Sequence, residues 1–247
     1  MGKCIFGSAR HDENGKLQGG KVGDNLQSGS GNDYKGEVSL QSGYVHSKGW
    51  VILRPKSDDL AHRLAYAMLR ACNNKHIGYD QGNRLAIISK GIDTTTDTEC
   101  DCSSLVRACL KSCGITAQNF TTANAVTLIA GTGEFTIVQF KSLETVFTGD
   151  ILCTKTKGHI VICVEGKERG TNKPTLAKAT IKKGDSGENV KNLQLDLNYI
   201  MGTSLSVDGK AGSKTIQTLR NWQTKYGLVA DGSYGPKSEN KMKSLLS

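Results

Sequence analysis

A repeated turn near the C-terminus is the feature that most constrains the fold. Residues 207–215 (VDGKAGSKT) and 230–238 (ADGSYGPKS) share the pattern small-Asp-Gly-x-x-Gly-x-Lys-Ser/Thr. Each copy predicts an Asp-Gly turn that caps the start of a helix. Between the copies, apolar residues recur at helical spacing: Ile216, Leu219, Trp222 and Tyr226. With a further helix opened by residues 184–187, this pattern predicts a small three-helix domain over residues 179–247.

The remainder of the chain contains helices followed by strands. Ser57 is a favourable N-cap for an amphipathic helix over residues 57–74, and a second helix begins at or just after Cys102 and stops at Gly114. The apolar pattern also predicts a short helix at 122–131 and strands at 38–41, 50–53, 136–140, 151–153 and 159–164. This order predicts an α+β domain with an antiparallel sheet over residues 1–165.

Two further segments have weak patterns. Residues 1–50 are rich in Gly, Ser, Asn and Asp, and we interpret them as turns and short strands. Residues 166–178 (GKERGTNKPTLAK) are polar and have no apolar periodicity, which predicts a linker between the two domains.

The chain has 247 residues and a formal net charge of +9. A basic protein is attracted to polyanions, and both nucleic acid and an anionic cell envelope fit that description. The first fifteen residues have no apolar core of a signal peptide, and no run approaches the roughly 18 apolar residues of a membrane helix. We therefore expect a soluble protein made in the cytoplasm, which needs another route if it acts outside the cell.

There are eight cysteines in a long chain without an export signal, so mostly free thiols are expected. Cys100, Cys102, Cys109 and Cys113 could together supply four zinc ligands. The stripe that Cys109 and Cys113 share with apolar residues is more simply the buried face of a helix, because free cysteine packs as a small apolar residue. We therefore predict no metal and no other cofactor.

Cys102 stands where the second helix begins, and this position suits a nucleophile. The unpaired backbone N–H groups and the dipole of a helix N-terminus stabilise a thiolate and lower the thiol pKa. The same amides could hold a developing oxyanion. Among five histidines, His159 directly follows a glycine at the start of a buried strand, so its ring is expected at the sheet edge beside this helix. This pattern predicts a Cys–His pair.

Three blocks of the sequence resemble NlpC/P60 cysteine peptidases. Residues 101–106 (DCSSLV) are similar to the signature Asp-Cys-Ser-Gly-Leu-Val of that family. Residues 149–152 (GDIL) and 158–162 (GHIVI) resemble its Gly-Asp-Leu and Gly-His-Val-x-Ile elements, and residues 77–79 (IGY) stand where it has a tyrosine. The resemblance covers roughly residues 60–165. It implies a papain-like fold that cuts peptide bonds in bacterial cell-wall stem peptides.

The same resemblance implies roles for individual residues. Cys102 would be the nucleophile, His159 the general base, and Tyr79 and Ser103 would line the substrate site. Tyr79 as a buried core residue is the alternative.

The NlpC/P60 family also places a polar third residue after the histidine strand to orient its ring. Here that stretch is linker-like. Asn172 and Glu165 are the candidates that it offers, so the third position stays unassigned.

The C-terminal domain resembles the peptidoglycan-binding domain 1 family. The matching segments are 183–187 (KGDSG), 222–223 (WQ), 226–228 (YGL) and 230–236 (ADGSYGP). The resemblance implies a three-helix module that binds the cell wall. It makes Tyr234 a candidate exposed contact, with packing in the core as the alternative.

The first 55 residues resemble the leader region of some phage and prophage endolysins of Gram-positive bacteria. Residues 44–50 (YVHSKGW) are part of this likeness. The resemblances together predict a two-domain peptidoglycan hydrolase, favoured as an endopeptidase that cuts between D-glutamate and the diamino acid. It would act on the wall after release by a phage holin or by lysis.

Three alternatives remain open at this point. The same thiol chemistry serves an N-acetylmuramoyl-L-alanine amidase. A wall-binding protein with an inert catalytic domain fits the unassigned third residue. A basic nucleic-acid binder with structural zinc fits the charge, but it leaves the C-terminal module unexplained. The predicted partner is peptidoglycan, with no nucleic acid and no insertion into a membrane.

Overall fold

The computed structural model describes residues 4–23, 37–167, 176–178, 180–201, 203 and 205–246. The chain divides into two compact units, Met1–Arg169 and Gly170–Ser247. Within the described ranges, no helix combines the length and the apolar character needed to cross a bilayer.

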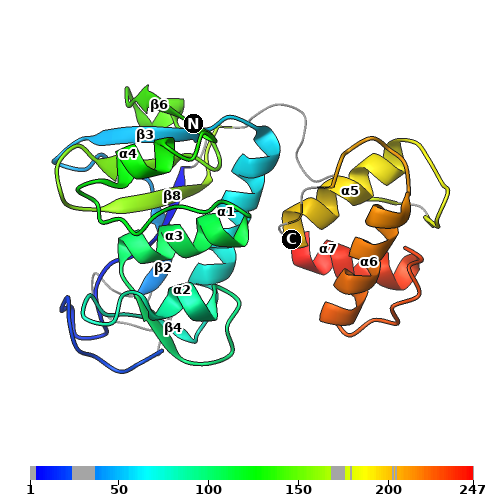
Figure 1. The fold of residues 1–247 in the computed structure, drawn as a ribbon, viewed down its shortest axis with the longest axis horizontal. Helices are drawn as coiled ribbons and strands as arrows, with labels where there is room; N and C mark the ends of the chain where they lie inside the picture. The colour runs from blue at the N-terminus through cyan, green and yellow to red at the C-terminus, as the bar shows by residue number, and fades with distance from the viewer. Residues whose placement is uncertain are drawn as a thin grey trace. The chain divides into compact units, whose positions relative to one another are not determined.

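The first unit is built on a six-stranded sheet with the order β2-β1-β8-β7-β3-β6 (Figure 1). The strands are β1 (Ile5–Ala9), β2 (Val38–Ser42), β3 (Trp50–Pro55), β6 (Phe135–Gln139), β7 (Ile151–Thr154) and β8 (Ile160–Glu165). Every neighbouring pair in this sheet is antiparallel. The predicted α+β class with an antiparallel sheet is therefore confirmed.

The sequence patterns did not predict the first strand. β1 has the sequence IFGSA, and it pairs with β2 on one side and with β8 on the other. Phe6 lies opposite Cys163 and Gly7 lies opposite Ile162. The N-terminal segment therefore forms part of the main sheet and borders the strand that follows His159.

Helices cover one face of this sheet. They are α1 (Asp58–Cys72), α2 (Ala86–Lys90), α3 (Cys102–Ser112) and α4 (Ala125–Ala130). Ser57 caps α1 as predicted, because its Oγ accepts a hydrogen bond of 3.1 Å from the Leu60 amide. α1 and α3 pack against each other and against β8 (Figure 1). Their shared core is apolar and includes Leu64, Met68 and Leu105.

Two short elements complete this side of the unit. β4 (Ile77–Tyr79) and β5 (Thr98–Cys100) form a small parallel pair, and β5 leads directly into α3. A 3₁₀ turn (Leu143–Thr145) precedes β7.

An aromatic cluster covers the opposite face of the sheet. Phe6 and Trp50 are buried there, and Tyr44 packs edge-on against both, with ring centroids 5.9 and 5.6 Å away. The indole N–H of Trp50 donates a 2.9 Å hydrogen bond to the Tyr44 carbonyl. The loop before β3, which the sequence linked only to endolysin leader regions, thus completes the core.

The Gly149-Asp150 turn before β7 is held by two structural devices. Gly149 has a φ of +85°, and a Cβ there would lie 2.3 Å from the carbonyl oxygen of Ala61, so only glycine fits. The fully buried Asp150 carboxylate accepts two hydrogen bonds from Arg54, at 3.0 and 2.7 Å. This bidentate pair ties β3 to the start of β7.

The second unit contains three helices, as the repeat predicted: α5 (Glu188–Met201), α6 (Ser213–Lys225) and α7 (Pro236–Leu246). A glutamine holds each Asp-Gly turn. Gln194 accepts from the Gly209 amide and donates to the Asp208 carboxylate, both at 2.9 Å. Gln223 makes the same two bonds, again at 2.9 Å each, with the second turn. The repeated turns therefore serve as scaffold.

Tyr234, on the second turn, is fully buried. Its backbone pairs with that of Ile181 through two hydrogen bonds of 2.9 Å, and its hydroxyl has no hydrogen-bond partner. Burial is the main cause that raises the pKa of this phenol. The expectation of an exposed Tyr234 that contacts the wall is therefore wrong, and the alternative of core packing is correct.

Candidate functional site

Cys102 is the first residue of α3. The preceding Asp101 is the N-cap, and its Oδ1 accepts a 2.6 Å hydrogen bond from the Ser104 amide. The Asp101 amide in turn donates to Ser104 Oγ at 2.9 Å. This reciprocal capping box explains why the helix begins here and places the Cys102 side chain at its N-terminus.

Arg84 holds the other oxygen of the cap. Its Nε donates a 2.6 Å hydrogen bond to Asp101 Oδ2, and its Nη2 donates at 2.6 Å to the Phe120 carbonyl. Arg84 therefore joins the loop before α2, the start of α3 and the loop after α3. No sequence pattern indicates this role, because the three segments meet only through the fold.

The Cys102 thiol lies against the start of β8, the strand that follows His159. The backbone amides of Ile160 and Ser103 both favour its thiolate, and Ser103 Oγ lies 3.9 Å from the sulfur. Cys102 is only 8% exposed, however. Burial and then the Asp101 carboxylate raise the pKa of Cys102 to about 11. The predicted thiolate is therefore wrong for this structure, because loss of hydration outweighs the helix amides.

His159 immediately precedes β8, and Thr154 fixes its backbone. The His159 amide donates to Thr154 Oγ1, and its carbonyl accepts from the Thr154 amide, both at 3.0 Å. The ring atom Nε2 is buried without a hydrogen-bond partner. Burial, followed by Arg10 and His46, lowers the pKa of His159 to about 4. The imidazole is therefore neutral at neutral pH.

The structure thus brings the Cys102 thiol against Ile160, the residue that follows His159. The side chains of Cys102 and His159 are both uncharged at neutral pH. No hydrogen bond between the thiol and the imidazole occurs among the interactions of the described residues.

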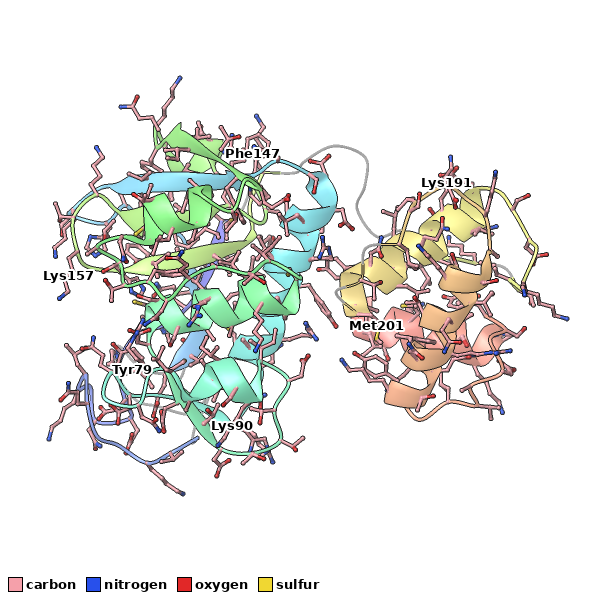
Figure 2. All side chains as sticks on the ribbon, viewed as in Figure 1. Tyr79, Lys90, Phe147, Lys157, Lys191 and Met201 are labelled. Carbon is pink, nitrogen blue, oxygen red and sulfur yellow. The ribbon has the colours of Figure 1, made fainter. Side chains whose placement is uncertain are left out.

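Tyr79 and Ser103 also lie at this end of α3. Tyr79, labelled in Figure 2, is 3% exposed, and its hydroxyl accepts a 3.1 Å hydrogen bond from Gln81. Burial is the main cause that raises the pKa of Tyr79, and a charge on Cys102 contributes to it. Ser103 is 2% exposed. Both predicted substrate residues are thus close to the thiol but largely covered.

The N-terminal segment contributes two further groups. Arg10 follows β1, and its guanidinium contacts Gln41 at 2.5 Å and Ser39 on β2. The His46 ring packs on Trp50, with centroids 5.3 Å apart. The sequence patterns did not indicate a role for either residue. Both lower the pKa of His159, although each lies more than a hundred positions away in the chain. Only the pairing of β1 with β8 could have indicated Arg10.

Neither candidate for the third residue is supported. Glu165 is exposed at the far end of β8, which at about 3.3 Å per residue is roughly 20 Å from His159. Glu165 therefore does not orient the ring. Asn172 lies outside the described residues.

All eight cysteines are free thiols. Cys100 is fully buried, and its thiol donates to the Gly78 carbonyl at 3.4 Å. Across the described residues, no group of three or more His, Cys, Asp or Glu side chains is arranged to hold a metal ion.

Comparison with known families agrees with this architecture. Residues 6–170 match the model of the endolysin-like domain, which is well over half of the chain. The chain belongs to the endolysin-like domain family. The match begins at residue 6, so the N-terminal strands are part of the family domain. Residues 186–242 match a peptidoglycan-binding domain, the family that the C-terminal repeat resembles.

Individual relatives match over short stretches. The zinc D-Ala-D-Ala carboxypeptidase of Streptomyces albus G is 40% identical over 68 residues, which is 27% of this chain and 27% of that enzyme. The "Probable N-acetylmuramoyl-L-alanine amidase" of Bacillus licheniformis is 52% identical over 40 residues, or 16% of this chain and 11% of that protein. The chain therefore covers well under two thirds of either relative.

A solved structure is also similar in part. The crystal structure of a peptidoglycan-binding protein from Clostridioides difficile, in complex with glutamine hydroxamate, is 29% identical to this chain. The match covers 40% of this chain and 52% of that one, with a TM-score of 0.27.

Proposed function

We propose that the protein is a peptidoglycan hydrolase in which Cys102 attacks a peptide bond of the wall and His159 moves the protons. The favoured bond is the one between D-glutamate and the diamino acid of the stem peptide. Residues 1–165 would be a papain-like catalytic domain of the NlpC/P60 type, residues 166–178 a linker and residues 179–247 the wall-binding module. The observation that best supports the proposal is the Cys102 thiol at the N-terminus of α3, against the amide that follows His159.

The protonation states imply how the reaction begins. A thiol with a pKa of about 11 and an imidazole with a pKa of about 4 are both neutral at pH 7. His159 therefore accepts the thiol proton while Cys102 Sγ attacks the carbonyl carbon, and a thiolate–imidazolium pair is not formed in advance. The amides at the start of α3 stabilise the oxyanion of the tetrahedral intermediate.

The second half of the reaction reverses the proton movement. His159 gives its proton to the leaving amine, and the first product departs from the Cys102 thioester. Water then attacks the thioester while His159 takes a proton from it. Collapse of this second intermediate releases the carboxylic acid and restores the neutral thiol and imidazole.

The C-terminal unit would keep the enzyme on its insoluble substrate. Two linked sites that engage one wall raise the local concentration of scissile bonds, and this effect needs no new contact at the catalytic site. The net charge of +9 should favour anionic walls, so that binding weakens as salt increases. Because the proposed substrate lies outside the membrane, the proposal includes release of the protein by a holin or by lysis.

One relative supports a second candidate activity. The matched Bacillus licheniformis protein is named as an amidase, and the same Cys–His chemistry could cleave the bond between the lactyl group and L-alanine. A non-catalytic wall-binding protein is the remaining alternative, motivated by the third catalytic residue, which is unassigned.

Mass spectrometry of muropeptides released from purified Gram-positive walls tests the proposal. New N-terminal amines on the diamino acid, produced by the wild type and lost in Cys102→Ala, are the expected result. Cys100→Ser is the matched control, because a serine hydroxyl can also donate to the Gly78 carbonyl, and it should retain the activity.

The other outcomes separate the alternatives. Free lactyl groups with intact stem peptides would identify an amidase. Binding to walls without any release of fragments by the wild type would contradict catalysis and leave the wall anchor as the function. Equal release by wild type and Cys102→Ala would refute the assignment of the nucleophile.

A further inference from the structure

Two thiols meet in the first unit, away from Cys102. The Sγ atoms of Cys4 and Cys163 lie 3.9 Å apart, although 159 positions separate the two residues in the chain. Cys4 directly precedes β1, and Cys163 lies in β8, where it is opposite Phe6 of β1. We propose that Cys4 and Cys163 are a redox modification site, which a peroxide converts into a disulfide that links the start of the chain to the strand following His159.

The surrounding backbone leaves room for the two sulfurs. A Cβ at Gly43 would lie 3.0 Å from Cys4 Sγ, and a Cβ at Gly166 would lie 2.7 Å from Cys163 Sγ. Neither glycine has a positive φ. Their backbone conformations therefore do not require glycine. A Cβ would instead crowd the sulfurs and, at Gly166, also the Val146 carbonyl oxygen, 2.9 Å away. Two segments distant in sequence thus both approach this thiol pair closely.

The two thiols differ in access. Cys163 is fully buried, whereas Cys4 is partly exposed at the edge of the aromatic core. Contact with the Cys163 thiol is the main cause that lowers the pKa of Cys4, whereas the pKa of Cys163 is raised well above the ordinary value. Cys4 therefore ionises first and meets an oxidant first.

The chemistry balances with hydrogen peroxide as the oxidant. The Cys4 thiolate attacks one peroxide oxygen and expels hydroxide, which gives a sulfenic acid. The Cys163 sulfur then attacks the sulfenic sulfur, and the S–S bond forms as water leaves. In total, two thiols and one peroxide give one disulfide and two waters. Closing 3.9 Å to a bond of about 2.05 Å needs movement mainly of the partly exposed Cys4 side chain.

The disulfide would stabilise the sheet. It closes a loop of more than 150 residues, which restricts the unfolded chain, and it joins the N-terminal end of β1 to β8. The melting temperature of the first unit is therefore expected to rise on oxidation by roughly 5–10 °C.

Peptide mapping of the full-length Cys102→Ala protein tests this proposal without using activity, so its outcome is independent of the proposed hydrolysis. The protein is treated with hydrogen peroxide, alkylated with iodoacetamide and digested with trypsin without reduction. Cys4 falls in the peptide 4–10 (CIFGSAR) and Cys163 in the peptide 158–167 (GHIVICVEGK), each with a single cysteine. The expected product is these two peptides joined, with the mass of two hydrogens lost.

Control variants complete the test. Cys4→Ser should abolish both the linked peptide and the rise in melting temperature, whereas Cys153→Ser, which removes a thiol from the neighbouring strand, should keep both. Dithiothreitol should reverse both effects. The proposal is overturned if both cysteines remain fully alkylated after peroxide treatment, if Cys4 stops at sulfinic acid, or if it links to another cysteine instead.

Discussion

The reaction of the Cys102 thiol with iodoacetamide is expected to accelerate about tenfold for each pH unit between about pH 6 and pH 9. The reason is the pKa of about 11 that burial imposes on this thiol. At pH 7, four units below that value, about one molecule in 10⁴ carries the thiolate. Because the neutral His159 cannot form an ion pair with a thiolate, no reactive thiolate–imidazolium form of the protein is expected at lower pH.

Quenched alkylation followed by mass spectrometry measures this rate at the single site. Trypsin releases Cys102 in the peptide 91–107, which also contains Cys100. The Cys100→Ser variant leaves one thiol in that peptide. Its rates, determined at a series of pH values, give the slope directly, and Cys102→Ala gives the background.

A plateau in the rate below pH 7 would refute this reasoning, because it would show a preformed thiolate–imidazolium pair. Asp101→Asn provides a second check. Asparagine caps a helix as well as aspartate does, but it removes the negative charge that raises the pKa of Cys102. Alkylation of this variant at pH 7 should be several times faster. An unchanged rate would mean that the Asp101 charge does not act on the thiol.

Three further predictions concern stability and are measured by thermal denaturation of the full chain. Asp150→Ala removes the carboxylate that pairs with Arg54 and leaves this guanidinium its hydrogen bond to the Thr145 carbonyl. The change should cost about 3 kcal/mol, or roughly 6–12 °C in Tm; a loss below 2 °C would contradict this. Gly149→Ala should cost about 2 kcal/mol or more, because the new Cβ meets Ala61 at a positive φ, and an unchanged Tm would contradict it. Burial raises the pKa of Asp196 to about 7. The protonated Asp196 side chain therefore stabilises the folded state fully below about pH 4, and this contribution is lost as the pH rises through 7. Asp196→Asn should remove this pH dependence of Tm. If the dependence of Tm on pH is unaltered in the variant, other groups cause it.

Local sequence patterns were sufficient to predict most of the helices and strands. The amphipathic stripe and Ser57 predicted α1, and the Asp-Gly repeat predicted the three helices of the second unit. The strands over residues 38–42, 50–55 and 160–165 followed from short apolar runs. These features depend on neighbouring residues, so a single sequence is enough to indicate them.

The remaining features depend on pairing between distant segments. β1 has a short sequence with a glycine in its middle, and its place between β2 and β8 follows from the sheet rather than from its own pattern. The thiol of Cys102 shows the same limit. Its position at a helix N-terminus could be predicted from the sequence. The burial that reverses the expected pKa shift comes instead from the packing of α3 against β8.

The place of β1 also bears on the unassigned third residue of the proposed catalytic site. β1 is antiparallel to β8, with Phe6 opposite Cys163 and Gly7 opposite Ile162, so the end of β1, which Arg10 follows, runs toward the start of β8, which His159 precedes. The N-terminal segment thus approaches the histidine end of β8, whereas the segment after β8 begins at the other end of that strand. A guanidinium only donates hydrogen bonds, so it cannot stabilise an imidazolium as a carboxylate would. Burial and, after it, Arg10 lower the pKa of His159, which in the proposed mechanism favours a neutral base that takes the proton only during attack.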